Sequence, residues 1–164
     1  MGARFGPPVA AMRAYLDAMD AGQVVLGSIG PRMLALAGER AKGAFPLGMP
    51  VVHTVAARKS LGPGKFLGVA MAVVLDPDRD RGREFARSSV AAFLPNREKS
   101  LRALGYAVDH PDERLVDALV VSGDVERILA RAGEHLDAGA DHVALHVLAP
   151  EGRKPLLAWR ELLV

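Results

Sequence analysis

Residues 23–45 read QVVLGSIGPRMLALAGERAKGAF, and this stretch decides the expected fold. An apolar run ends at residues 27–31, GSIGP, and a segment whose apolar residues have helical spacing follows at once. Pro31 suits the first turn of a helix, because the N–H that proline lacks has no partner there. We interpret the stretch as a parallel strand that delivers its carboxyl end to a helix N-terminus, where α/β folds bind anionic groups.

The same alternation of strand and helix continues along the chain. Residues 67–75, LGVAMAVVL, are apolar on both faces, as central parallel strands are. Strands are predicted at 23–29, about 43–46, 67–75 and 141–148, and helices at 8–19, 31–42, 53–60, 78–93, 95–104, 112–121, 125–138 and 155–163. This order predicts an α/β fold with a parallel sheet and right-handed crossovers, in one domain over residues 1–164.

Composition excludes several classes of function. The 21 basic and 19 acidic residues are dispersed, with no basic stripe for nucleic acid. There is no cysteine, which excludes disulfides and thiolate metal sites and fits a reducing, cytoplasmic setting. No apolar run reaches the ~20 residues that span a bilayer, so no membrane partner is expected.

Several segments together resemble the luciferase-like monooxygenases, in particular the branch that uses the deazaflavin coenzyme F-420. Within the resembling segment FLPNREKSLRALGY, Arg97 and Glu98 stand where relatives usually carry Tyr and Asn. The segments are PVAAMRAYLDAMDA (8–21), GPRMLALAGERAKGA (30–44), VVHT (51–54), ARKSLGPG (57–64), FLPNREKSLRALGY (93–106), ERLVDALVVSGD (113–124) and HLDAGADHVALHVL (135–148).

The resemblance implies a (β/α)8 TIM barrel, but only part of one. A full barrel needs about 250 residues and eight strands, whereas four strands are predicted here, so we expect the last four strand–helix units with the N-terminal half of the barrel absent. In relatives that front half supplies the usual catalytic groups, so no catalytic residue is assigned. The implied activity is redox chemistry on a small-molecule substrate with F-420, or with FMN as the alternative. The rival hypothesis is a truncated, inactive half-barrel that acts as an oligomerising or partner-dependent module.

The first candidate cofactor site is the turn before the helix predicted at 31–42. The Ser28 hydroxyl and the backbone N–H groups of Gly30 and Arg32 would face a cofactor phosphate, and the helix dipole and the Arg32 charge would add attraction. The alternative is a plain strand-to-helix turn that needs a glycine. The resemblance favours the cofactor site.

A second turn of this kind is Ser122-Gly123-Asp124, near which relatives place a contact to the cofactor tail. Ser122 and Gly123 are therefore candidate cofactor contacts. Asp124 is an anion that would repel phosphate and would cap the following helix well, and capping is the favoured role for it.

The histidines do not predict a metal site. His142 and His146 have HxxxH spacing, but on a strand they stand about 13 Å apart, too far for one ion. His146 lies nearer the carboxyl end, where it lines the cofactor mouth or serves as a structural polar residue. His53 either caps its helix, with Thr54 as a possible N-cap, or touches the cofactor tail. His110 and His135 are assigned to a loop and a helix surface.

A four-stranded fragment of a barrel has two free edges, expected at 23–29 and 141–148. The side chains of Val25 and Val73 are expected to face the missing wall of the barrel and to leave apolar surface in water. The sequence therefore predicts a homo-oligomer.

Overall fold

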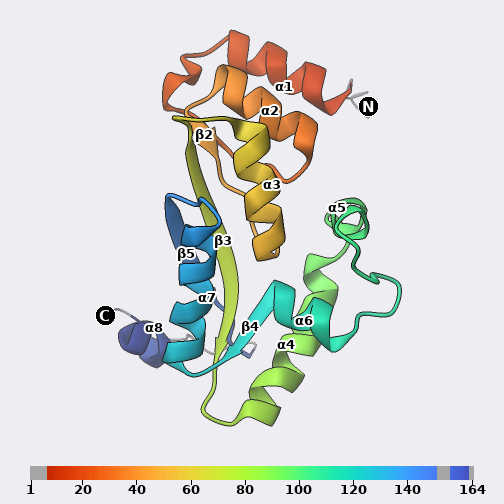
Figure 1. The fold of residues 1–164 in the computed structure, drawn as a ribbon, viewed down its shortest axis with the longest axis vertical. Coiled ribbons are helices and arrows are strands. Elements are labelled where there is room, and N and C mark those ends of the chain that lie inside the picture. Colours follow the sequence, from red (N-terminus) through yellow and green to blue (C-terminus); the bar gives the residue numbers. More distant parts are fainter. Residues whose placement is uncertain (1–6, 151–155, 163–164) are drawn as a thin grey trace, which may run out of the picture.

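A computed structural model of the protein describes residues 7–150 and 156–162. These residues form one parallel sheet flanked by helices (Figure 1). The strands are β1 (Val25–Leu26), β2 (Gly43–Ala44), β3 (Phe66–Leu75), β4 (Val120–Gly123) and β5 (His142–Val147). The helices are α1 (Pro8–Asp17), α2 (Pro31–Arg40), α3 (Val51–Leu61), α4 (Arg79–Phe93), α5 (Glu98–Ala103), α6 (Glu113–Leu119), α7 (Val125–Asp137) and α8 (Leu156–Leu162), with a short 3-10 turn at Ala21–Gln23.

The long strand β3 organises the sheet. Along one edge it pairs first with β2 and later with β4, and along the other edge with β5. The backbone of Ala70 bonds to residues 46 and 48, whereas the carbonyls of Leu67 and Val73 accept from residues 141 and 148, which places β5 opposite the other strands. β1 completes the sheet by pairing with β2. All pairings are parallel, so the carboxyl ends of the strands point the same way.

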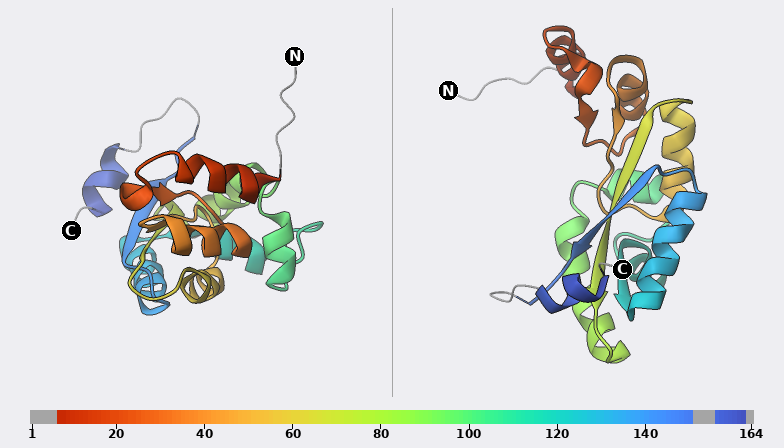
Figure 2. Two further views of the ribbon diagram at one scale, coloured as in Figure 1. Left: turned by 90° about the horizontal axis from the view of Figure 1, so that it is seen from above. Right: turned by 90° about the vertical axis from the view of Figure 1, so that its left-hand side faces the viewer.

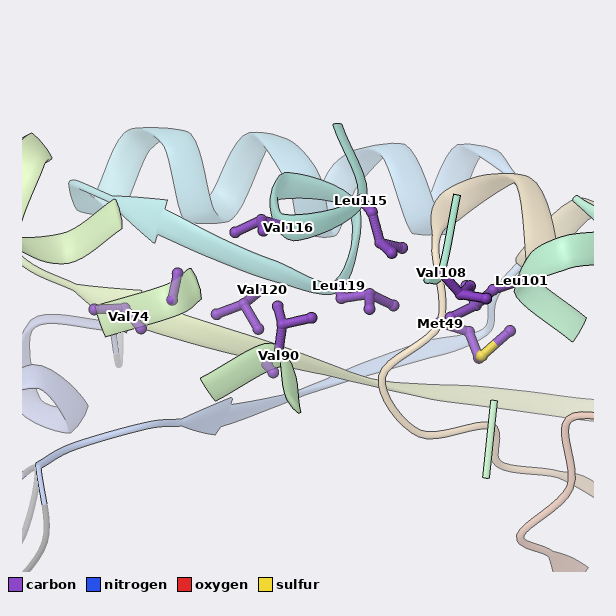
Figure 3. Packing of buried hydrophobic residues seen from close by; sticks show 11 residues of the cluster. Met49, Val74, Val90, Leu101, Val108, Leu115, Val116, Leu119 and Val120 are labelled. Carbon is purple, nitrogen blue, oxygen red and sulfur yellow. The ribbon is translucent and has the colours of Figure 1, made fainter. Parts of the chain in front are cut away.

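Helices cover both faces of the carboxyl half of β3 (Figure 2). Val73 is fully buried in a cluster with Ile128 of α7, on the outer face of a barrel strand. Val74 points to the opposite face, where it joins side chains of α4, α6 and β4 (Figure 3). The expectation that Val73 would lose its opposing wall is therefore wrong, because it belongs to the face that α7 covers. Val25 is half-buried.

A separate cluster holds the amino-terminal part of the sheet. Leu26, Ala44 and Leu67 come from three adjacent strands and pack against Leu34 of α2 and Leu61 of α3. Within α2 and its C-cap, Leu34, Ala37 and Ala41 of this cluster recur at the spacing of one helix face. This packing fixes where α2 begins relative to the end of β1, and so it builds the local geometry of the candidate site.

The predicted alternation is confirmed, with two differences. The strands predicted at 23–29 and 43–46 are shorter in the structure, because only the residues of β1 and β2 pair with neighbouring strands. A fifth strand, β4, was not predicted: residues 120–121 were assigned to the end of a helix. Helix α6 ends at Leu119 because Val120 adopts extended backbone (φ −134°, ψ 109°) and pairs with Ala72.

Three strands of the described sheet have an unpaired edge, namely β1, β4 and β5. The edges at β1 and β5 were expected for a barrel fragment, and the edge at β4 was not. Among the helices of the described part of the chain, none is long and apolar enough to cross a bilayer.

Candidate functional site

The turn between β1 and α2 presents a polar atom without a protein partner. Ser28 is only 6% exposed, and its Oγ is buried and makes no hydrogen bond. Two residues later Gly30 forms the N-cap of α2 in extended backbone (φ −79°, ψ 143°), and no side chain caps the helix. A Cβ placed on Gly30 would meet no atom within 4 Å. The start of α2 therefore combines open space, an unused hydroxyl and the N–H groups of Gly30 and Arg32, since Pro31 has no N–H and Met33 donates to the Gly30 carbonyl.

Three other helices begin differently, whereas α1, α3 and α5 also lack a side-chain cap. The carboxylates of Asp78, Asp112 and Asp124 each accept from backbone N–H groups in the first turns of α4, α6 and α7. An Asp cap satisfies those donors and adds negative charge, so these termini are closed to an anion. The uncapped N-terminus of α2 keeps the positive end of its dipole available.

The second candidate turn, Ser122-Gly123, lies at the other end of the sheet. Asp124 accepts from the N–H of Arg127 at 2.9 Å, which confirms that Asp124 caps α7. A small hollow of about 50 Å³ opens beside the turn and is bordered by Arg79 and Arg83. Guanidinium groups there offset the Asp124 charge, and Arg127 itself is paired with Asp117.

His53 lies directly behind the Ser28 turn. It is 4% exposed, and its Nε2 lies 2.8 Å from the carbonyl oxygen of Ile29. That carbonyl can only accept, so Nε2 carries the proton and the buried, unpartnered Nδ1 keeps its lone pair. Burial lowers the pKa of His53, which keeps the ring neutral. His53 is not a helix cap, because α3 begins after Pro50.

Two sequence assignments on α3 and α7 are corrected here. Thr54 lies within α3 and does not cap it. Its Oγ1 lies 2.8 Å from Nδ1 of His135, which is 3% exposed and not on the helix surface as assigned. Burial, then the positive charge of Arg131, lowers the pKa of His135 to about 4, so Nδ1 stays free to accept from the threonine hydroxyl.

His142 and His146 are both exposed on β5. His146 meets the ring of Phe93, at the end of α4, edge to face with 6.5 Å between ring centroids. In the described ranges no group of three or more potential ligand side chains is arranged to hold a metal ion.

The six candidate cofactor residues therefore do not form one cluster. Ser28, Gly30 and the exposed Arg32 share the start of α2, whereas Ser122 and Gly123 end β4. In the register of the sheet, Leu26 aligns with residue 67 of β3, so Ser28, two residues later, aligns with about residue 69. Gly123 aligns with residue 75. Along the strands the two turns are therefore about six residues, or about 20 Å, apart. One phosphate cannot touch both turns.

Comparisons with solved structures report two enzymes that use coenzyme F-420. The F-420-dependent tetrahydromethanopterin reductase from Methanopyrus kandleri matches with a TM-score of 0.60 and 22% identity, over 82% of this chain and 47% of that one. An F-420-dependent secondary alcohol dehydrogenase, solved with an F-420–acetone adduct, matches with a TM-score of 0.58 and 15% identity, over 79% of this chain and 44% of that one.

The fold is part of a (β/α)8 barrel and is shared with both enzymes. This chain spans less than half the length of either solved enzyme, which confirms the predicted partial (β/α)8 barrel. No protein-family model and no curated sequence matches the chain. At these identities the half-barrel likeness establishes the fold alone.

Proposed function

We propose that this half-barrel is the phosphate-binding part of an oxidoreductase that uses the deazaflavin coenzyme F-420. The single observation that carries the proposal is the buried, unpartnered Ser28 hydroxyl at the uncapped start of α2. The proposal is also supported by the fold that this chain shares with two enzymes named as F-420-dependent. A hydroxyl that has lost its water and found no protein partner destabilises the fold unless a ligand satisfies it.

The residues present at the α2 start fit a phosphate group. Pro31 has no N–H, and the N–H groups of Met33 and Leu34 donate to the Gly30 carbonyl, so the N–H groups of Gly30 and Arg32 are the backbone donors left at the positive end of the helix dipole. Ser28 Oγ supplies a further donor, and Arg32 on the first turn adds an exposed positive charge. A side chain at position 30 would fill the open space that the phosphate needs.

The neutral His53 orders this site from behind. Its Nε2–H holds the Ile29 carbonyl, and Ile29 lies between Ser28 and Gly30. Its free Nδ1 lone pair accepts a hydrogen bond from a hydroxyl, which suits a sugar-like chain next to a phosphate. A bound deazaflavin supplies hydride-transfer chemistry, and the role of these residues is to hold and orient it. Ser122, Gly123 and His146 remain proposed contacts for more distant parts of an extended cofactor, and the cytoplasm is the proposed location.

The alternative, an oligomerising half-barrel without activity, is favoured by a different observation. The chain spans less than half of each solved enzyme, and both β1 and β5 present unpaired edges in the described sheet. Under this alternative the Ser28 turn is a plain connection and has no preference for phosphate.

Fluorescence titration of the purified chain with F-420, and in parallel with FMN, distinguishes the two. The proposed site predicts saturable binding that Gly30→Asp abolishes, because the new carboxylate occupies the place of the phosphate. Gly27→Asp, at an exposed glycine three residues earlier, is the matched control and should retain binding. Equal affinity of wild type and Gly30→Asp would refute the site, and saturable binding of FMN alone would assign the other cofactor.

A further inference from the structure

Arg97 is a half-buried cation, and some of its guanidinium N–H groups have no hydrogen-bond partner among the described residues. Its Nε donates to the carbonyl of Leu47 at 3.0 Å, and its Nη1 donates to the carbonyl of Phe93 at 2.6 Å. The guanidinium carbon lies 5.4 Å from the centroid of the Phe93 ring. These contacts fix the plane of the guanidinium and use two of its five N–H groups, which leaves one N–H on Nη1 and two on Nη2 as free donors.

The other half-buried arginines of the described chain are each neutralised by a carboxylate. Arg13, Arg58 and Arg131 have side-chain partners in Glu39, Asp141 and Asp117 at 2.8, 2.7 and 3.0 Å. Within residues 7–150 and 156–162, no carboxylate lies within 4.0 Å of Arg97. Burial lowers the pKa of Arg97, which is the direction expected of a desolvated cation without a counter-charge. A bound anion would compensate that cost.

Gly48 and Phe93 lie against the guanidinium of Arg97. Gly48 has a positive φ of 59°, and a Cβ there would lie 3.3 Å from the Phe93 ring and 3.6 Å from Nη2 of Arg97. The exposed ring of His146 meets Phe93 edge to face. Ile29, in the turn before α2, packs against the same apolar cluster as Phe93.

We propose that Arg97 forms a binding site for the carboxylate group of a small organic molecule. The free N–H groups on two nitrogens of one guanidinium match the two oxygens of a carboxylate. The site gives the substrate class of the proposed oxidoreductase as carboxylates, and this role rests on the proposed function. The binding itself does not depend on any cofactor.

The test uses benzoate as the probe and benzamide as its neutral counterpart. Heteronuclear NMR on the 15N-labelled 164-residue chain follows the arginine side-chain Nε–H signals during titration with each compound at constant ionic strength. Benzoate should shift the Arg97 signal saturably, and benzamide should bind at least about tenfold more weakly, as expected for loss of a charge-assisted hydrogen bond. Arg97→Gln should lose benzoate binding by a similar factor. Arg102→Gln, in the helix α5 that Arg97 precedes and paired with Asp109 in the wild type, is the matched control and should bind normally.

Equal binding of benzoate and benzamide by the wild type would overturn the proposal, even if Arg97→Gln does not fold. Arg97 would then be a structural tie between α4 and the turn at Leu47. Titration of the same sample with inorganic phosphate, followed at the backbone signals of residues 28–32, separates the two sites. Phosphate binding without benzoate binding refutes the Arg97 site alone, and benzoate binding without phosphate binding refutes the proposed cofactor site alone.

Discussion

Gly30→Ala separates the folding role of the α2 turn from its proposed binding role. The backbone angles of Gly30 are ordinary for alanine, and the added methyl group meets no protein atom within 4 Å. Replacing a glycine in such a position removes conformational freedom from the unfolded chain and stabilises the fold by about 0.4–1 kcal/mol. For a chain of this size the melting temperature should rise by about 1–4 °C.

The same methyl group lies in the path of an anion that approaches the first N–H groups of α2. Loss of one charge-assisted hydrogen bond costs about 1.5–3 kcal/mol, which lowers the affinity for F-420 or phosphate by roughly 10- to 150-fold. Calorimetry measures both quantities on one sample. Gly27→Ala is the control: Gly27 is also free of neighbours within 4 Å, so it should gain the stability and keep the affinity. Unchanged affinity in Gly30→Ala, or an equal loss in Gly27→Ala, would refute the reasoning.

Ser28→Ala removes a buried hydroxyl without a partner, so urea unfolding of the ligand-free chain should show a gain of about 1 kcal/mol while phosphate affinity falls; a loss of stability would mean that the hydroxyl supports the fold. The pKa of His135 falls from 6.5 to about 4 on folding, so the unfolded chain binds the extra proton and stability drops by about 3 kcal/mol as the pH falls from 6.5 to 4. His135→Gln should flatten that dependence in urea titrations, His110→Gln should not, and an unchanged slope in His135→Gln would contradict the assignment. We also expect a homo-oligomer paired through the open edge of β5; sedimentation velocity should show Ala144→Lys to be smaller than the wild type, and a monomeric wild type would exclude this.

The sequence predicted the elements whose pattern is local. The doubly apolar run of β3 and the Gly-Pro start of α2 carry their own signals, and both are confirmed. β4 was missed because Val120 and Val121 continue the apolar spacing of α6, although two β-branched residues before Ser-Gly favour a strand. Residues 120–121 form a strand because Val120 pairs with Ala72 of β3, and Ala72 lies far away in the sequence.

Long-range partners also explain what was missed at the candidate site. His135 carries no local sign of burial, since its partner Thr54 lies 81 residues earlier. The Ile29 contact of His53 likewise depends on how α3 packs beside β1. The Asp caps, in contrast, were readable at Asp124 because a cap acts within its own helix turn.

Different strands pair with different parts of β3, and this affects how the chain unfolds locally. The segment from α1 to α3 packs in its own cluster, and β2 joins the ladder at Phe66 and Leu67, while β4 and β5 pair with residues further along β3. Such an arrangement favours two cooperative units, whose amide protons exchange with solvent at different free energies of opening. Side-chain contacts between the units include the Thr54–His135 hydrogen bond, the Arg58–Asp141 ion pair and the hydrogen bond from Arg97 to the Leu47 carbonyl. Fraying of the first unit would release an anion from the α2 turn while the amides of β3 and β5 stay protected, so ligand residence time would report the stability of one part of the chain and not of the whole.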